Sequence, residues 1–315
     1  LLLETLHPDA TALLEGWGTV VLAEGAGAVE AATAGGHVAA ILTRGHGRVT
    51  RELLARCPEL AVVARCGVGV DNIDVEAATA RGIPVVFAPG STTTAVAEHA
   101  LMLMLAAARR LCTLNGAVHA GNWAIRNGWS SVELAGKTLG IVGLGDIGRR
   151  VAELADAFGM TIVYWSRSSR DDRYRYLPLD ELLARSDVIS LHVGLNDQTR
   201  HLFGAEELAR MRPGAILINT ARGGVVDQGA VAAALDAGPL GLFASDVLEG
   251  QPPPASDPLL GHQRVLLTPH VAALTDATYR HICVRSARNV LAILRGEPPE
   301  AEAIYNRERL ESGEW

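Results

Sequence analysis

Short runs of apolar residues alternate with helix-like patterns along almost the whole chain. From residue 1 to about residue 90, the runs that predict strands are Leu1–Leu3, Thr19–Leu22, Val38–Leu42, Ala61–Ala64 and Pro84–Phe87. From Thr138 onward the same alternation predicts six further strands, of which Val265–Thr268 is the last. Apolar strands separated by helices are typical of parallel sheets that helices cover on both faces. The pattern therefore predicts an α/β protein.

The stretch from Thr138 to Ser166 combines a strand, a glycine turn, an amphipathic helix to about Phe158 and a second strand that ends at Trp165. Glycines let a phosphate approach the backbone, and the unpaired N–H groups of a helix N-terminus attract it. An ordinary strand-to-helix turn is the alternative, but the flanking elements favour a dinucleotide site. The predicted cofactor-binding residues of this turn are Gly143, Gly145, Asp146, Ile147 and Gly148.

A long apolar segment precedes this unit, from Thr94 to about Gly116, and we expect it to form one helix. A helix that is apolar on most faces must be buried on several sides. An interdomain core helix would satisfy this requirement, but the arm that follows, through Trp123 and Trp129, would have little to cover it in a monomer. We therefore predict a homodimer that forms through this helix and arm, about residues 99–130.

The last predicted helix, about Asp276–Leu294, is long enough to carry the chain back to its first segment. The first domain would then be built from both ends of the chain. We place a substrate-binding, flavodoxin-like domain at 1–95 and 287–315, and a dinucleotide-binding Rossmann domain at 96–286.

Composition narrows the class of protein. The 315 residues are 49% hydrophobic, which is enough for two cores, and the net charge of −7 comes without a basic stripe, which argues against a nucleic-acid partner. The four cysteines lie far apart without metal-ligand spacing, so we expect reduced thiols and no metal. No apolar run approaches the ~20 residues that a membrane span needs. Nothing resembles a signal peptide, and we expect a cytoplasmic protein with no membrane partner.

Three motifs follow predicted strands of the Rossmann domain, at residues 219–224 (NTARGG), 245–252 (SDVLEGQP) and 268–270 (TPH). Because strand C-termini in this fold face the ligand crevice, Arg222, Asp246 and His270 are predicted to lie at the nicotinamide end of a dinucleotide. Hydride transfer needs a proton donor or acceptor, a cation for an anionic substrate and an oriented cofactor. His270 suits the first role, Arg222 suits the second, and Asp246 could hold the cofactor. Thr220 and Ala221 are added as cofactor-binding residues. An isolated histidine would be better interpreted as structural.

These motifs, together with residues 136–148 (GKTLGIVGLGDIG), 218–227 (INTARGGVVD) and 67–74 (GVGVDNID), resemble the D-isomer-specific 2-hydroxyacid dehydrogenases over essentially the whole chain. The resemblance implies two Rossmann-like domains around a cleft, dimerisation through the long helix, and catalysis by Arg222 and His270. It also implies that backbone N–H groups of Val68 and Gly69 hold the carboxylate of a small 2-oxo or 2-hydroxy acid, such as glyoxylate or hydroxypyruvate. Arg44, in a second loop, could pair with a further anionic group.

The first departure from the family pattern concerns the partner of the catalytic histidine. Where the family usually has a Glu that hydrogen-bonds this histidine, the chain has Gln251. A carboxylate stabilises imidazolium more than an amide does, so we expect His270 to titrate lower than in typical members. The family's formate dehydrogenases have Gln at this position, which makes formate oxidation an alternative. Those enzymes also carry an Asn where this chain has Thr92.

The second departure follows the second dinucleotide strand. NAD-preferring relatives have an acidic residue there, whereas this chain has Ser166, followed by Arg167 and Arg170. A hydroxyl beside guanidinium groups suits a 2′-phosphate, so we favour NADP(H), with NAD(H) as the alternative. A regulator on the same fold, similar to the C-terminal-binding-protein corepressors, is the remaining alternative to an enzyme.

Overall fold

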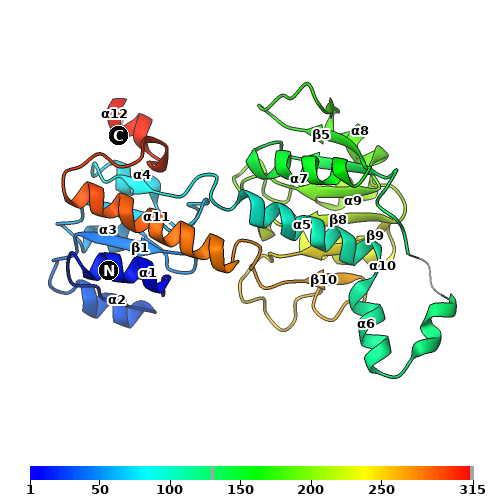
Figure 1. Ribbon diagram of the computed structural model, residues 1–315, viewed down its shortest axis with the longest axis horizontal. Coiled ribbons are helices and arrows are strands. Elements are labelled where there is room, and N and C mark those ends of the chain that lie inside the picture. The colour runs from blue at the N-terminus through cyan, green and yellow to red at the C-terminus, as the bar shows by residue number, and fades with distance from the viewer. Residues whose placement is uncertain (129–130, 313–315) are drawn as a thin grey trace. The chain divides into compact units, whose positions relative to one another are not determined.

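The computed structural model describes residues 1–128 and 131–312, which form two compact units (Figure 1). The first unit takes Leu1–Thr92 and the chain from Leu274 onward, and the second takes Thr93–Ala273. Trp129, part of the predicted arm, and the last three residues of the predicted first domain lie outside the described residues.

The first unit is a three-stranded parallel sheet, in the order β1-β2-β3, with helices around it. Its elements are α1 (Pro8–Glu15), α2 (Ala26–Thr33), β1 (Ala40–Thr43), α3 (Arg51–Ala55), β2 (Val62–Arg65), α4 (Val75–Thr79), β3 (Val85–Val86), α11 (Asp276–Leu294) and α12 (Arg307–Ser312), with a 3-10 turn at Ala301–Ala303. The strands predicted at Leu1–Leu3 and Thr19–Leu22 are absent from the described sheet, because this part of the chain meets its neighbours only at single bridges from Leu2 to Leu22 and Leu42.

Helix α11 belongs to the first unit along its whole length. Ile282 and Cys283, in its first half, are buried in the same core as Val62 and Val86 of the sheet. The chain therefore returns to this unit at Leu274, earlier than the predicted position 287. The apolar face of α11 starts well before residue 287, which is why the boundary moves.

The C-terminal segment completes the edge of β3. Ile304 forms an antiparallel bridge with Val86, and the side chain of Asn306 accepts the N–H of Val85 at 2.9 Å. The Nδ2 group of Asn306 also donates to Oγ1 of Thr79 at 2.8 Å and to the carbonyl of Ile83 at 3.0 Å. Asn306 is only 3% exposed, so its side chain and the backbone beside it together serve as the lateral partner that a further strand would have provided.

The second unit is built on a seven-stranded parallel sheet in the order β10-β9-β8-β7-β4-β5-β6. Its strands are β4 (Thr138–Val142), β5 (Thr161–Trp165), β6 (Arg175–Tyr176), β7 (Val188–Leu191), β8 (Ala215–Asn219), β9 (Leu240–Ser245) and β10 (Val265–Leu267). Its helices are α5 (Thr93–Ala108), α6 (Leu111–His119), α7 (Asp146–Ala157), α8 (Leu179–Arg185), α9 (Ala205–Ala209) and α10 (Gln228–Asp236), with 3-10 turns at Trp123–Gly128 and Gly223–Val225.

This order is that of a Rossmann sheet with one strand added, and it confirms the predicted fold class. The sequence pattern missed β6, because its two residues are exposed and form no apolar run. The strand order reverses between β4 and β7, and in such sheets the ligand crevice opens at the carboxyl ends of the strands beside the reversal. Residues 143 and 192 follow these two strands.

The predicted single helix 94–116 is two helices. Arg110 has φ 48°, a left-handed conformation that interrupts the helical hydrogen bonds, and α5 and α6 are bent by 60° at this point. Helix α5 packs against α7 and over β8 and β9. Helix α6 has no buried residue and projects from the body of its unit (Figure 1). Burial on several sides within the unit therefore holds for α5 but not for α6, whose burial against a second subunit stays a prediction.

Among the described residues no single helix is both long and apolar enough to cross a membrane, although α5 and α6 taken together pass a test of length and composition.

Candidate functional site

The glycine turn after β4 has three different steric requirements. A Cβ on Gly143, which has φ 98°, would lie 2.5 Å from the carbonyl oxygen of His192. A Cβ on Gly148 would lie 2.1 Å from the carbonyl oxygen of Gly143, so this glycine lets α7 pack against the turn. Gly145 has no heavy atom within 4 Å of the corresponding position. Two glycines therefore close the turn, while the third leaves open space above it.

Helix α7 begins in that open space. Gly145 is its N-cap, and Asp146 and Ile147 are its first two residues. The first N–H groups of a helix have no partner within the helix, and its N-terminal end carries a partial positive charge. The open space at Gly145 and these N–H groups have the chemistry that a dinucleotide pyrophosphate needs, and the binding roles of these residues stay a prediction.

The loop after β5 is ordered around Ser166. The Ser166 side chain accepts the N–H of Ser169 at 3.2 Å, and the residue is only 7% exposed. Arg170 donates to the carbonyl of Ser166 at 3.0 Å and lies over the ring of Tyr176 at 4.6 Å. Arg167 is exposed and hydrogen-bonds Gln198. The loop thus holds one guanidinium against its own backbone and presents the other at the surface.

Three neighbouring strands bring the predicted catalytic residues to one edge of the sheet. In the registers of β8, β9 and β10, Asn219 pairs with Ser245 and Ser245 pairs with Leu267. Arg222, Asp246 and His270 follow within three residues of these positions. The strand ends therefore place the three motifs side by side, as the sequence predicted.

The turn that carries Arg222 is shaped by the buried side chain of Asn219. Its Oδ1 accepts the N–H of Ala221 at 3.0 Å, and its Nδ2 donates to the carbonyl of Arg222 at 3.0 Å. A Cβ on Gly223 would lie 2.0 Å from the backbone of Leu248, so the turn packs directly on the loop after β9. The hydroxyl of Thr220 is buried and has no hydrogen-bond partner among the described residues. The cofactor-binding role of Thr220 and Ala221 stays a prediction.

Asp246 organises the turn that carries His270. Its Oδ1 accepts the hydroxyl of Thr268 at 2.6 Å and the N–H of Val271 at 2.9 Å, while Oδ2 accepts the N–H of Ala272 at 2.8 Å. The main-chain carbonyl of Asp246 accepts the N–H of His270 at 2.8 Å. Asp246 is 1% exposed, so its carboxylate chiefly builds this turn. Its contact with a cofactor remains a prediction.

Gln251 lies beside His270. The Oε1 atom of Gln251 is 2.7 Å from Nδ1 of His270, and Nε2 of Gln251 donates to the carbonyl of Leu248 at 3.3 Å. This second bond fixes which end of the amide faces the ring. An amide oxygen can only accept, so Nδ1 carries a proton and Nε2 is the nitrogen whose proton can be exchanged. Glu249, the nearest carboxylate in sequence, pairs instead with Arg200 and His201.

Sequence reasoning missed two histidines near these turns. His192 follows β7 next to the glycine turn, and its Nε2 lies 2.8 Å from Oγ of Ser190. Burial lowers the pKa of His192 from 6.5 to about 3, so the ring is neutral near pH 7. His99, on α5, has its Nε2 atom 3.0 Å from Oγ1 of Thr268. Neither residue belongs to a motif, and only the fold brings them to the turns.

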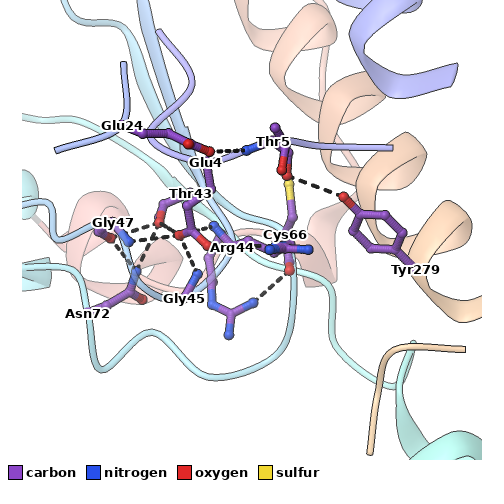
Figure 2. Close-up of polar contacts among 11 residues, drawn as sticks. Glu4, Thr5, Glu24, Thr43, Arg44, Gly45, Gly47, Cys66, Asn72 and Tyr279 are labelled. Carbon is purple, nitrogen blue, oxygen red and sulfur yellow. Dashed lines mark hydrogen bonds and ion pairs between the residues drawn. The ribbon is translucent and has the colours of Figure 1, made fainter. Parts of the chain in front are cut away.

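In the first unit, Glu4 organises the loop that carries Arg44 (Figure 2). Its Oε1 accepts backbone N–H groups from Arg44, Gly45 and Gly47 at 3.0, 2.8 and 2.8 Å. The guanidinium of Arg44 lies 3.6 Å from Oε2 of Glu4 and 5.3 Å from the ring centre of Tyr279. Arg44 thus already has an anionic neighbour, and its role toward a substrate stays a prediction.

The loop containing Val68 and Gly69 lies beside the Arg44 loop. Asn72 joins the two loops, because its Nδ2 donates to the carbonyl of Gly47 at 2.7 Å and to Oγ1 of Thr43 at 3.2 Å. Among the described residues, neither Val68 nor Gly69 donates its N–H to another protein group. Two free neighbouring N–H groups can receive an anion.

Comparison with known proteins gives a consistent result. Residues 101–272 match the family model for the NAD-binding domain of D-isomer-specific 2-hydroxyacid dehydrogenases. The chain is 44% identical over 272 residues to a glyoxylate reductase from Aeropyrum pernix, covering 83% of this chain and 81% of that protein. It is 40% identical to a D-3-phosphoglycerate dehydrogenase from Methanocaldococcus jannaschii over 95% of this chain, but it spans only 58% of that longer relative.

A solved structure of a glyoxylate reductase from Paecilomyes thermophila superimposes with a TM-score of 0.86, at 34% identity, over 94% of this chain and 95% of that one. The glycine turn, the strand-end motifs and these likenesses all lead to one conclusion. The chain belongs to the family of D-isomer-specific 2-hydroxyacid dehydrogenases, which are oxidoreductases that act on CH–OH donors.

Proposed function

We propose that the protein reduces a small 2-oxo acid, of the glyoxylate or hydroxypyruvate type, and oxidises the corresponding D-2-hydroxy acid. The observation that carries this proposal is the pair formed by His270 and Gln251, in which the amide oxygen of Gln251 lies 2.7 Å from Nδ1 and so assigns the proton exchange to Nε2. The relatives that are named glyoxylate reductase support the same substrate class. A bound nicotinamide would supply or accept the hydride at the carbon that bears the oxygen.

In the reductive direction, Nε2 of protonated His270 donates the proton to the substrate oxygen, and in the oxidative direction the neutral ring accepts it. Gln251 fixes the tautomer by accepting from Nδ1. The amide adds no negative charge, so it stabilises the imidazolium less than a carboxylate would. As the pH rises, the rate of reduction is therefore expected to fall at a lower pH than in relatives that have Glu at this position.

Arg222 is the proposed partner of the substrate carboxylate. Its guanidinium can hold a carboxylate through two parallel hydrogen bonds and polarise the neighbouring carbonyl. The backbone N–H groups of Val68 and Gly69 are proposed to bind a substrate carboxylate. Arg44 would select a second anionic group only by exchanging its contact with Glu4. A substrate with a single carboxylate is accordingly favoured over a phosphorylated one.

For the cofactor we propose NADP(H), with NAD(H) as the alternative. The first strand–helix pair would hold the pyrophosphate at Gly145 and the N-terminus of α7. Ser166 offers a hydroxyl, and Arg167 offers an exposed guanidinium, where an acidic residue would repel a 2′-phosphate. Arg170 would have to leave its place over Tyr176 to contribute.

We also propose that two copies of the chain associate through α6 and the turn that follows it. Leu111, Val118 and Trp123 are 58, 48 and 66% exposed, and they lie in a segment without buried residues. Exposed apolar side chains gathered in this way are typical of an interface. Sedimentation equilibrium of the wild type and of Trp123→Glu would measure the association directly.

Formate oxidation is the second candidate, and Gln251 is the observation that favours it. One panel of assays separates the candidates: glyoxylate, hydroxypyruvate and other small 2-oxo acids are tested with NADPH and NADH, and formate is tested with NADP⁺ and NAD⁺. Turnover of a 2-oxo acid supports the proposal. Turnover of formate alone favours the second candidate, and cofactor binding without any turnover favours a nucleotide-sensing binding protein.

A further inference from the structure

His99 approaches the turn that carries His270 from a different element. It belongs to α5, which packs over β8 and β9. Its Nε2 atom lies 3.0 Å from Oγ1 of Thr268 and 3.6 Å from Oδ1 of Asp246. The His99 side chain is 13% exposed, so water competes little for these contacts.

The direction of the hydrogen bonds follows from the number of protons available. The hydroxyl of Thr268 has one proton, which it donates to Oδ1 of Asp246 at 2.6 Å. Oγ1 of Thr268 can then only accept from His99, so the Nε2 atom of His99 carries a hydrogen. The three side chains form a directed chain from the ring N–H of His99, through the hydroxyl, to the carboxylate.

This chain ends on the residue that holds His270 in place. His270 has φ 57°, a left-handed conformation that a non-glycine residue keeps only when its surroundings impose it. The bonds from Asp246 to Val271 and Ala272, and its carbonyl contact with the N–H of His270, impose that conformation. Each of them depends on the position of the Asp246 carboxylate or backbone.

We propose that His99 is a positioning residue for the reaction: it fixes Asp246 through Thr268, and thereby fixes the direction in which His270 presents Nε2. The inference rests on the proposed role of His270. A histidine that merely filled space between α5 and the sheet would be replaceable by any side chain of similar size. A positioning histidine requires a hydrogen-bond donor at this place.

Four variants separate these two roles. His99→Leu keeps the approximate size and removes the donor, and His99→Gln restores an N–H at similar reach. Thr268→Val removes the middle of the chain, and Glu98→Gln is the matched control, because Glu98 is the exposed neighbour of His99 on α5. We measure kcat and KM for the most active 2-oxo acid, the dissociation constant of the reduced cofactor, and the thermal midpoint.

We expect His99→Leu to lower kcat about tenfold, which corresponds to about 1.4 kcal/mol of lost transition-state stabilisation. The dissociation constant of the cofactor should stay within about twofold of the wild-type value. His99→Gln should recover most of kcat. Thr268→Val should give a similar loss, and the double variant His99→Leu with Thr268→Val should lose no more than either single variant. Wild-type kcat in His99→Leu, equal losses in the Leu and Gln variants, or additive losses in the double variant would overturn the proposal.

Hydrogen exchange of the peptide that contains residues 268–272 makes the test independent of turnover. If the wild type reduces no acid in the panel, the proposed function fails, and exchange at Val271 and Ala272 then decides the inference alone. Faster exchange in His99→Leu that returns toward the wild-type rate in His99→Gln supports positioning. Unchanged exchange in His99→Leu refutes it.

Discussion

Replacing Glu4 by glutamine should reduce the stability of the first unit by an amount that depends on pH. Burial by itself would raise the pKa of the Glu4 carboxyl, but hydrogen bonds from Gly47, Gly45, Thr43 and Arg44 together lower it from 4.5 to about 2. Because the folded pKa lies below the unfolded one, the charged form stabilises the fold above pH 4.5. This stabilisation is lost as the pH falls from 4.5 toward 2.

The size of the effect follows from the pKa difference. A shift from 4.5 to about 2, at 1.36 kcal/mol for each pKa unit, gives about 3 kcal/mol at pH 7. The same two values leave about 2 kcal/mol at pH 3.5. Glutamine keeps an oxygen acceptor for the loop and lacks the charge, so the Glu4→Gln variant should be less stable by these amounts.

Urea unfolding between pH 7 and pH 3.5 measures the difference in free energy of unfolding between the wild type and Glu4→Gln. Hydrogen exchange of the peptides that span β1 and β2 reports on the first unit alone. Glu24→Gln is the matched control, because among the described residues Glu24 accepts a single exposed backbone N–H, from Thr5 at 3.3 Å. Its effect should be a few tenths of a kcal/mol, as is usual for a surface change. If the difference in free energy of unfolding between the wild type and Glu4→Gln stays constant over this pH range, the charge of Glu4 is not what stabilises the loop.

Four further changes test the second unit. The neutral His192 should make the free energy of unfolding fall by up to about 1.4 kcal/mol for each pH unit as the pH decreases from 6.5 to 4.5, because only the unfolded chain takes up that proton. This slope should decrease in His192→Asn, and equal slopes would exclude the residue as its source. Gln251→Glu should move the alkaline limb of reductive kcat upward by about one pH unit or more, since the carboxylate stabilises imidazolium, and coincident pH–rate profiles would contradict this. Ser166→Asp should raise the KM for NADPH about tenfold or more and spare NADH, whereas a wild type that already prefers NADH would refute the cofactor proposal. Gly148→Ala should weaken cofactor binding and lower the thermal midpoint, because its Cβ would lie 2.1 Å from the carbonyl oxygen of Gly143. If calorimetric titration gives the wild-type cofactor affinity, the backbone of the turn can shift to accommodate the added methyl group.

The parts of the site that depend on neighbouring residues in sequence could be predicted. The glycine turn, the start of α7 and the strand-end motifs each lie within one short stretch. The rule that parallel strands present their carboxyl ends at one edge was enough to group Arg222, Asp246 and His270. The contact between Gln251 and His270, at 2.7 Å, followed from the family pattern, although 19 residues separate the two.

The remaining contacts depend on distances along the chain that no local pattern encodes. His99 and Thr268 are 169 residues apart, and Glu4 and Gly47 are 43 apart. Glu4 belongs to no motif, yet it is 7% exposed, because three backbone N–H groups take the place of water. The break at Arg110 was missed for a different reason: the apolar pattern continues through it, and only the backbone conformation shows it.

The closing of the β3 edge by Asn306 has a consequence for synthesis of the protein. Val85 and Asn306 are 221 residues apart, and at about 5 to 20 residues per second the ribosome needs roughly 10 to 45 s to make the chain between them. The second unit is complete in sequence before that interval ends, whereas the first has an open strand edge throughout it. During synthesis the second unit can therefore fold before the first unit is completed by the C-terminal segment. Until then, the edge of β3 is the surface that a chaperone would have to shield.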